Sequence, residues 1–227
     1  MMQFDRMALG KKARELGFVR DTFEKVCRLA EVLDFIQKDA LLSKTLALKG
    51  RTVNLPWLEQ ELTVLSVDPM EIYGSKIVAL FNRAAPRDLY DIHTMMENGL
   101  FDESQEPMLK KCVVFYSAIG SDVVPDRFHF EKITSVSRQR VKTDLIPVLR
   151  RGTWFDAQQA HEQVIAYLEK LLTLDERELS FLISFGQQEY RPELLFQDTG
   201  ILSRIGQHPM ALWKCSDRHN KPATETD

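Results

Sequence analysis

Apolar residues recur every three or four positions along most of this chain of 227 residues, which is the spacing of one face of an α-helix. The best strand candidate is LTVLSVD, residues 62–68, because it is rich in β-branched and aliphatic residues and is followed by Pro69. The main helical patterns after it cover residues 70–97, 106–119, 138–149 and 156–172. The spacing therefore predicts an α+β fold that is predominantly helical and holds only a small sheet.

Local signals indicate where several of these helices begin and end. Asp21 with Glu24 three residues later has the pattern of a capping box, which predicts a helix over residues 21–39. Pro86 divides the pattern of residues 70–97 into two helices, since proline is favoured at the first helical position. Further boundary signals are the N-cap Asp156, the capping box of Thr173 and Glu176, and the C-cap Gly186.

Charge is concentrated at the predicted junction of two helices, in the stretch GSKIVALFNRAAPRDLYDI, residues 74–92. Lys76 and Arg83 are seven positions apart and share one face of the first helix. Asp88 and Asp91 are three positions apart and share one face of the second helix. The two cations and the two carboxylates are therefore expected to meet where the helices join.

Two interpretations of this cluster follow from its chemistry. In the structural interpretation, Arg83 and Arg87 neutralise Asp88 and Asp91 in an inter-helix salt-bridge cluster. In the functional interpretation, the cluster handles phosphate, because lysine supplies a mobile charge, arginine a fork of donors, and carboxylates hold Mg²⁺. Phosphoryl and nucleotidyl transfer need all three kinds of group. The spacing alone leaves both interpretations open.

The same stretch, together with three others, resembles a known family. The others are LALKGRT before the strand candidate, ARELGFVRDTFEKVCRLAEVLDFI near the N-terminus and QEYRPELLFQDTGILSRIGQHPMALWK near the C-terminus. All four are similar to segments of the AbiEii/AbiGii nucleotidyltransferase toxins of type IV toxin–antitoxin and phage abortive-infection systems. The resemblance covers most of residues 11–214 and is most specific over residues 70–92 and 188–214.

The resemblance implies a polymerase-β-like nucleotidyltransferase domain followed by a helical C-terminal domain. It implies transfer of a nucleotide from an NTP, with Mg²⁺, to an acceptor such as the end of a tRNA. By the same resemblance Lys76 and Asp88 are catalytic residues, and Gly50 and Thr52 lie on a small-residue turn that cradles the triphosphate. The nucleotide-binding positions are Gly50, Thr52, Arg87 and Asp91.

The family resemblance also implies a cellular setting and partners. The expected partners are an NTP, tRNA or another RNA, and a cognate antitoxin that forms no stable complex with the toxin. The expected location is the bacterial cytoplasm, with a role in phage defence.

The chain departs from the family pattern at two places. Arg51 replaces the second glycine of the phosphate turn, where glycine permits positive φ and close backbone approach to phosphate. The Asp-x-Asp pair that the family places on a strand after this turn, to hold Mg²⁺, is absent from the chain. Loss of a metal-binding carboxylate removes most activity in such sites, so the absence argues against catalysis.

A substitute acidic pair keeps the metal site open as a hypothesis. Glu59 and Glu61 alternate as strand residues do and lie shortly after the turn, and Asp68 is a second candidate. Three readings remain: an enzyme with an unusual acidic pair, a catalytically inactive relative that binds nucleotide, RNA or protein, and a stable remnant without a role. The missing Asp-x-Asp pair distinguishes the first reading from the other two.

Composition sets the compartment and excludes some classes of site. The net charge of −3 supplies no overall basic field for nucleic acid. Cys27, Cys112 and Cys215 lie far apart without metal-ligand spacing, which is typical of a reducing cytosol. No apolar run is long enough for a signal peptide or a membrane span. We therefore expect a cytoplasmic protein without a membrane partner.

The predicted organisation is a nucleotidyltransferase-like domain with a shortened sheet over residues 10–98, a helical domain over residues 99–215 and a disordered tail over residues 216–227. Exposed strand edges in a shortened sheet favour a homodimer. Three apolar residues near the C-terminus are expected to close a hydrophobic core: Met210, Leu212 and Trp213.

Overall fold

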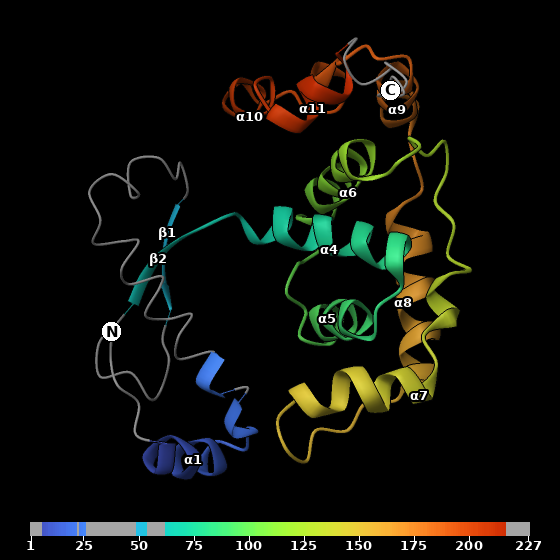
Figure 1. Ribbon diagram of the computed structural model, residues 1–227. Helices are drawn as coiled ribbons and strands as arrows, with labels where there is room; N and C mark the ends of the chain where they lie inside the picture. The colour runs from blue at the N-terminus through green and yellow to red at the C-terminus, as the bar shows by residue number, and fades with distance from the viewer. Residues whose placement is uncertain (1–5, 22, 26–48, 54–61, 217–227) are drawn as a thin grey trace, which may run out of the picture. The chain divides into compact units, whose positions relative to one another are not determined.

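The computed structural model describes residues 6–21, 23–25, 49–53 and 62–216, and the chain divides into two compact units (Figure 1). The first unit comprises Met1–Pro69 and Ser137–Phe155, and the second comprises Met70–Val136 and Asp156–Asp227. Helices dominate the described residues, so the predicted helical character of the fold is confirmed. Each unit is described by itself.

A small apolar cluster organises the helical part of the first unit, around helix α1 (Arg6–Glu15). Its members are Leu9, Ala13 and Phe23, which are buried, and Leu16 and Phe18, which pack against them. Arg150 reaches this cluster from a distant part of the sequence, and its Nε donates to the Leu16 carbonyl at 2.8 Å. The side chain of Arg150 therefore ties the end of α1 to the segment that contains residues 137–155.

The strands of the first unit form an antiparallel pair, β1 (Lys49–Val53) and β2 (Leu62–Ser66). Gly50 lies opposite Leu65, and Thr52 lies opposite Thr63. The strand predicted from LTVLSVD is confirmed. Because the described sheet is this one pair, the larger polymerase-β-like domain remains a prediction.

Residues 138–149 form three short turns of different kinds instead of the single helix that their pattern predicts. They are α7 (Arg138–Arg140), the π-helical η2 (Val141–Leu145) and the 3₁₀-helical η3 (Ile146–Val148). The N–H of Ile146 donates to the carbonyl of Val141, five residues earlier, and Pro147 has no N–H to donate. The proline therefore prevents a regular α-helical ladder from continuing here.

The second unit is all helical among its described residues. Its elements are α4 (Pro69–Arg83), α5 (Pro86–Glu97), α6 (Glu106–Gly120), η1 (Ile133–Ser135), α8 (Ala157–Leu171), α9 (Glu176–Gly186), η4 (Pro192–Leu194), α10 (Thr199–Ile205) and α11 (Pro209–Lys214). Helix α4 runs between α5 and α6 (Figure 1). The division of residues 70–97 at Pro86 is confirmed, with the proline in the first turn of α5.

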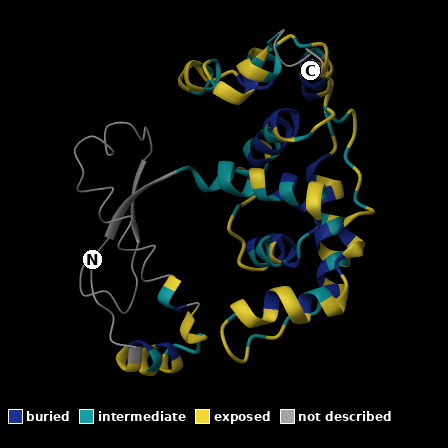
Figure 2. Ribbon diagram, viewed as in Figure 1, coloured by how far each residue is buried: buried dark blue, intermediate teal, exposed yellow. Residues whose placement is uncertain are grey.

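The largest apolar cluster of the second unit joins α6, α9 and the segment after α9. Its buried members include Val114, Phe115, Ala118, Phe181, Leu182, Phe185, Leu195, Phe196 and Ala211. Burial is concentrated on α5, α6 and α8, whereas α10 and α11 are largely exposed (Figure 2). Helix α6 therefore has one side in this core and another side available to α4.

Helix boundaries in the second unit confirm one prediction and correct two. The Asp156 side chain accepts from the Gln158 and Gln159 N–H groups, so the predicted N-cap of α8 is confirmed. The predicted capping box of Thr173 and Glu176 is wrong, and the true box lies two residues later. The box joins Asp175 and Glu178.

Thr173 is unavailable for capping α9 because it closes the preceding helix. Its Oγ1 donates to the carbonyl of Glu169 at 3.1 Å. At the other end of α9, Gly186 is the last helical residue, and the left-handed residue is Gln188, with φ 67°. The C-cap expected at Gly186 therefore lies one residue later, at Gln187.

Several predictions concern parts of the chain that lie outside the described residues or are not tested by the structure. The helix predicted over residues 21–39 lies mostly outside the described residues, as does the tail of residues 217–227. The domain boundary after residue 98 stays a prediction.

Candidate active site

A two-residue turn joins α4 to α5 and sets the geometry of the charged cluster. Ala84 has φ 44°, in the left-handed region that L-residues other than glycine, asparagine and aspartate seldom adopt. It is 4% exposed, and its N–H donates to the Leu80 carbonyl at 3.0 Å. Ala85 then serves as the N-cap position of α5, ahead of Pro86. The tight turn brings the polar faces of the two helices together.

The first ion pair across this junction is bidentate and anchors a buried carboxylate. Arg83 Nε lies 2.7 Å from Asp88 Oδ2, and Arg83 Nη2 lies 2.8 Å from Asp88 Oδ1. The Asp88 side chain is 4% exposed, whereas that of Arg83 is 66% exposed. Hydrogen bonding to Asp88, and then its charge, raise the pKa of Arg83. The N-terminal turn of α5 also favours the negative charge of Asp88.

The second ion pair lies one helical turn further along α5. Lys76 Nζ lies 2.5 Å from Asp91 Oδ2, and the two side chains are 36% and 33% exposed. Tyr73 lies close enough to feel both charges: burial raises the pKa of its hydroxyl, and the negative charge of Asp91 raises it further. Lys76 and Asp91 therefore form a solvent-accessible pair beside a half-buried phenol.

The predicted meeting of two cations and two carboxylates is confirmed, but one of the pairings is wrong. Lys76 binds Asp91, the place that the structural interpretation assigned to Arg87. Arg87 is exposed and makes no ion pair with any described residue. It precedes Asp91 by four positions, so both lie on one side of α5.

The opposite face of α4 packs on α6 without charge pairing. A Cβ placed on Gly74 would lie 2.7 Å from Cys112 Cβ and 3.1 Å from the Cys112 carbonyl carbon, so only glycine fits at this contact. Glu71 accepts a hydrogen bond of 3.0 Å from the Tyr116 hydroxyl. Helix α4 thus has a packed face on α6 and a charged face on α5.

The remaining predicted site residues lie elsewhere or are not described. Gly50 and Thr52 are strand residues of β1 and not members of a turn, because backbone pairing with β2 holds them extended. Glu59 and Glu61 lie outside the described residues. Asp68 is half-buried and has an interaction partner.

The described residues do not show a metal centre. No group of three or more His, Cys, Asp and Glu side chains among them has an arrangement that suits a metal ion. Asp88 accepts with both oxygens from Arg83, and Asp91 accepts from Lys76, so cations of the protein already hold these carboxylates. The arrangement fits the binding of phosphate by exchangeable cations better than the binding of Mg²⁺.

Two structural findings concern residues that are not among the predicted site residues. Met210, Leu212 and Trp213 are 46%, 44% and 49% exposed, so the prediction that they close a core is wrong. Ala211 is the buried residue of α11, because one face of this short helix meets α6 and the others meet solvent. The second finding is Tyr73, which lies three positions before Lys76, a spacing that places the two on one helical face.

The helices of the described chain include none with the length and apolar composition needed to cross a membrane.

Comparison with known proteins places the chain in a family. The family model described as nucleotidyl transferase AbiEii toxin, type IV TA system, matches residues 33–174, which is more than half of the chain. No curated protein and no solved structure matches the chain. The matched region contains β1, β2 and the whole junction of α4 with α5. The chain therefore belongs to the AbiEii nucleotidyl transferase toxin family of type IV toxin–antitoxin systems.

Proposed function

We propose that this protein binds an NTP with Mg²⁺ and transfers its nucleotide to an acceptor such as tRNA. The observation that carries the proposal is the Lys76–Asp91 pair, in which both side chains stay about one-third exposed at 36% and 33%. A lysine held by one accessible carboxylate can exchange that partner for a phosphate oxygen, because its ammonium is a mobile point charge. Family membership supports the assignment of that phosphate to an NTP.

Neighbouring groups of α4 and α5 supply what phosphate binding needs beyond one ammonium. The exposed guanidinium of Arg87, one turn before Asp91, offers a fork of donors to a second phosphate oxygen. The Tyr73 hydroxyl stays protonated because its pKa is raised, so it is available as a neutral hydrogen-bond donor. In this proposal Asp91 holds Lys76 in place until the nucleotide arrives.

Asp88 is held differently, and its assignment as a catalytic residue remains a prediction. Both of its oxygens accept from Arg83 in a buried position, so its geometry supports a positioning role at the junction. Gly50 and Thr52 on β1 keep their proposed nucleotide-binding role by family resemblance alone.

Mg²⁺ would neutralise charge on the transferring phosphate, but the described carboxylates do not fit it. We assign it to Glu59 and Glu61, which lie outside the described residues.

A second candidate function is that of a catalytically inactive relative that binds nucleotide, RNA or protein as a scaffold. The absence of an Asp-x-Asp pair and the neutralised state of Asp88 favour it. A type IV system implies an antitoxin partner for either candidate. We further propose that this antitoxin forms no stable complex with the protein, that the protein acts in the bacterial cytoplasm in phage defence, and that it forms a homodimer.

The first test is a thermal-shift titration of the full chain with ATP, GTP, CTP and UTP, each with and without Mg²⁺. A nucleotide at a hundred times its Kd should add about 2.7 kcal/mol to the free energy of unfolding. Lys76→Gln should abolish the shift. The matched control, Lys170→Gln, changes an exposed lysine in the last turn of α8 and should leave it intact.

The outcomes separate the candidates. A Mg²⁺-dependent shift that Lys76→Gln removes supports the transferase and justifies a search for the acceptor. A shift that is independent of Mg²⁺ favours the scaffold. The absence of a shift with every nucleotide contradicts NTP binding at this junction.

A further inference from the structure

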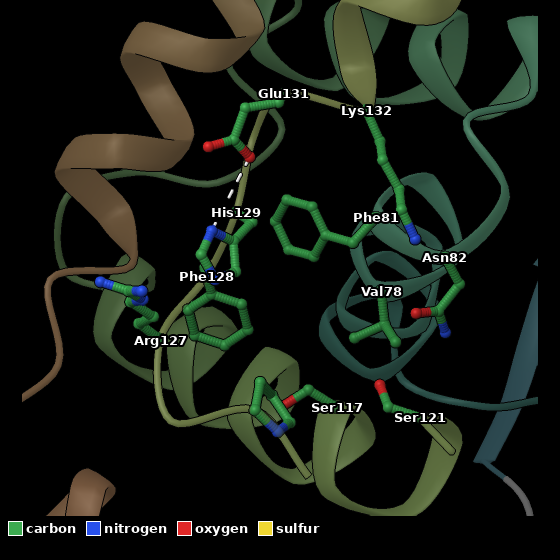
Figure 3. A pocket seen from close by; sticks show the side chains of 11 residues that line it. Val78, Phe81, Asn82, Ser117, Ser121, Arg127, Phe128, His129, Glu131 and Lys132 are labelled. Carbon is green, nitrogen blue, oxygen red and sulfur yellow. Dashed lines mark ion pairs between the residues drawn. The ribbon is translucent and has the colours of Figure 1, made fainter. Parts of the chain in front are cut away.

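An open pocket lies on the side of α4 that faces away from α5. Residues 121–132 connect α6 to η1 without regular structure and form one wall of a pocket of about 280 Å³. A connection of this length without helix or strand is uncommon in a compact unit and often carries a binding function. The other walls come from α4 and α6, through Val78, Phe81, Asn82 and Ser117. Figure 3 shows this lining from close by.

The pocket is separate from the two ion pairs. Lys76 and Arg83 lie on one face of α4 and bind residues of α5. Val78, Phe81 and Asn82 lie about half a helical turn away, and the Asn82 amide reaches the Gly120 carbonyl of α6 at 3.4 Å. A ligand in this pocket would therefore not contact Lys76 or Asp91.

Aromatic rings form the middle of the lining. The Phe81 and Phe128 rings have centroids 5.5 Å apart with an interplanar angle of 32°, and Phe130 meets Phe81 edge-on at 5.7 Å. Phe81 and Phe128 are both half-buried, so part of each ring remains open to a ligand. Partly exposed, preset rings of this kind bind a planar group by stacking.

Basic side chains surround these rings. In Figure 3, Lys132 extends on one side of Phe81, and His129 and Arg127 lie on the other. Arg127 and Lys132 are exposed, and neither makes an ion pair with a residue that the structure describes. Glu131 is the one acidic side chain of the lining, and it lies 3.7 Å from His129 and is 81% exposed. The unpaired charges of the rim therefore favour an anion.

Polar atoms of the pocket walls can form hydrogen bonds with the edge of a planar ligand. One N–H of the Asn82 amide donates to the Gly120 carbonyl, which leaves its other N–H and its oxygen for a ligand. Ser117 is 2% exposed, and its Oγ donates to the Val114 carbonyl at 2.8 Å, which leaves the lone pairs of Oγ free to accept. Rings, an amide, hydroxyls and two unpaired cations together match a nitrogen heterocycle that carries a phosphate.

We propose that this pocket binds one nucleotide, with its base against Phe81 and Phe128 and its phosphate on Arg127 and Lys132. The volume of about 280 Å³ lies just below the usual range for small-ligand sites, about 300–1,000 Å³, which suits one nucleotide and excludes a dinucleotide. The nucleotide comes either from a free nucleoside monophosphate or from an unpaired position of a nucleic-acid strand, because both present the same base and phosphate.

The test is isothermal titration calorimetry of the full chain with each of the four nucleoside 5′-monophosphates in EDTA. The corresponding nucleosides and inorganic phosphate serve as probes of each half of the ligand. At least one monophosphate should bind more tightly than its nucleoside and than phosphate. The double variant Arg127→Gln/Lys132→Gln should weaken it by about tenfold or more, since it removes two charge-assisted contacts.

Two further variants make the test specific to the pocket. Glu131→Gln removes the one negative charge of the lining and should tighten binding by about twofold or more. Phe128→Leu keeps an apolar side chain, and should weaken the monophosphate while leaving phosphate binding unchanged. Lys170→Gln, the control on α8, should leave every one of these affinities unchanged. The pocket variants lie outside the Lys76–Asp91 pair, so failure here is distinct from failure of NTP binding at Lys76.

Short single-stranded oligonucleotides of one base distinguish the two sources. Tighter binding of the oligonucleotide than of the monophosphate, lost in the same variants, identifies a strand as the ligand. Tighter binding of the monophosphate identifies a free nucleotide. The inference is overturned if neither binds, or if the pocket variants leave affinity unchanged.

Discussion

Two ion pairs connect the same two helices, and they are built in opposite ways. Arg83 holds Asp88 through two hydrogen bonds, of 2.7 and 2.8 Å, and the carboxylate side chain is 4% exposed. Lys76 holds Asp91 through one contact, and both side chains remain about one-third exposed, at 36% and 33%. The difference indicates that the Arg83–Asp88 pair maintains the junction and that the Lys76–Asp91 pair can release its partner to a ligand.

The physical basis of the comparison is the cost of leaving a charge without water. A buried carboxylate that loses its partner keeps its desolvation penalty, whereas an accessible carboxylate recovers its hydration. An arginine fork also fixes two oxygens at once, whereas an ammonium exchanges among acceptors. We therefore expect stability to depend on the first pair and ligand binding on the second.

The largest expected effect is the loss of the buried pair. Arg83→Ala leaves Asp88 buried without its two donors and should lower the free energy of unfolding by about 2–3 kcal/mol. Chemical denaturation in urea measures this loss. Asp88→Asn in the same background should restore part of it, because the neutral amide no longer requires a cation.

The double variant also supplies the control for this prediction. If Arg83→Ala lowers the free energy of unfolding by less than about 0.5 kcal/mol, the pair behaves as an ordinary surface pair, and the two ion pairs do not differ in their contribution to stability. If the cost is large but Asp88→Asn restores nothing, the loss comes from the packing of the arginine stem.

The packed face of α4 provides a second test, because it stabilises the helix without charge. Gly74→Ala places a Cβ 2.7 Å from Cys112 Cβ, and the displacement should outweigh the gain in helix propensity by about 1 kcal/mol. Gly186→Ala is the matched control, since its Cβ would meet only an ordinary contact of 3.8 Å with Val124. If the two variants changed the free energy of unfolding equally in denaturation experiments, the close contact of α4 with α6 at Gly74 would be contradicted.

Much of the fold follows from local sequence. The helices over residues 70–97 and 106–119, the break at Pro86, the strand in LTVLSVD and the Asp156 N-cap depend on side chains within a few positions of one another. The capping box of α9 was misplaced because two overlapping patterns fit the sequence. The use of Thr173 by the preceding helix decides between them, and this depends on where α8 ends.

The candidate site was predictable as a cluster but not in its pairing. The spacing of the sequence predicts that Lys76, Arg83, Asp88 and Asp91 lie together. Which cation binds which carboxylate depends on the turn at Ala84, and an alanine gives no sequence signal for the left-handed conformation that this turn adopts. The pocket could not be predicted from the sequence. Residues 121–132 show no helical or strand periodicity, so nothing in their sequence predicts that they pack beside α4.

The accessible pair should contribute little to stability and much to ligand binding. Lys76→Gln should cost about 0.2–1 kcal/mol, and the loss should shrink as salt is added, because water and ions screen exposed charges. Asp91→Asn should behave alike, and the double variant should show the coupling between the two. A loss as large as that of Arg83→Ala, measured by the same denaturation, would remove the distinction between the pairs.

The smallest expected effect concerns the half-buried imidazole of His208, which makes no ion pair with a residue that the structure describes. Burial lowers the pKa of His208, although the nearby charge of Glu71 opposes the shift, and its Nδ1 has no hydrogen-bond partner among the described residues. Because the folded pKa lies below the unfolded value of about 6.5, this stability is present above pH 6.5 and is lost as the pH falls through the folded pKa. For each unit by which the pH falls in this range, the free energy of unfolding should decrease by less than about 1.4 kcal/mol.

His208→Gln should flatten the part of the pH dependence that His208 causes, as measured by urea denaturation between pH 7.5 and about pH 5. Arg83→Ala should lower the free energy of unfolding by the same amount in the wild-type chain and in the His208→Gln variant. The reason is that His208 packs against Phe115 on α6 and not against the junction. If His208→Gln instead altered the cost of Arg83→Ala, the two regions would be energetically coupled. The Arg83–Asp88 pair would then not stabilise the α4–α5 junction independently of the rest of the second unit.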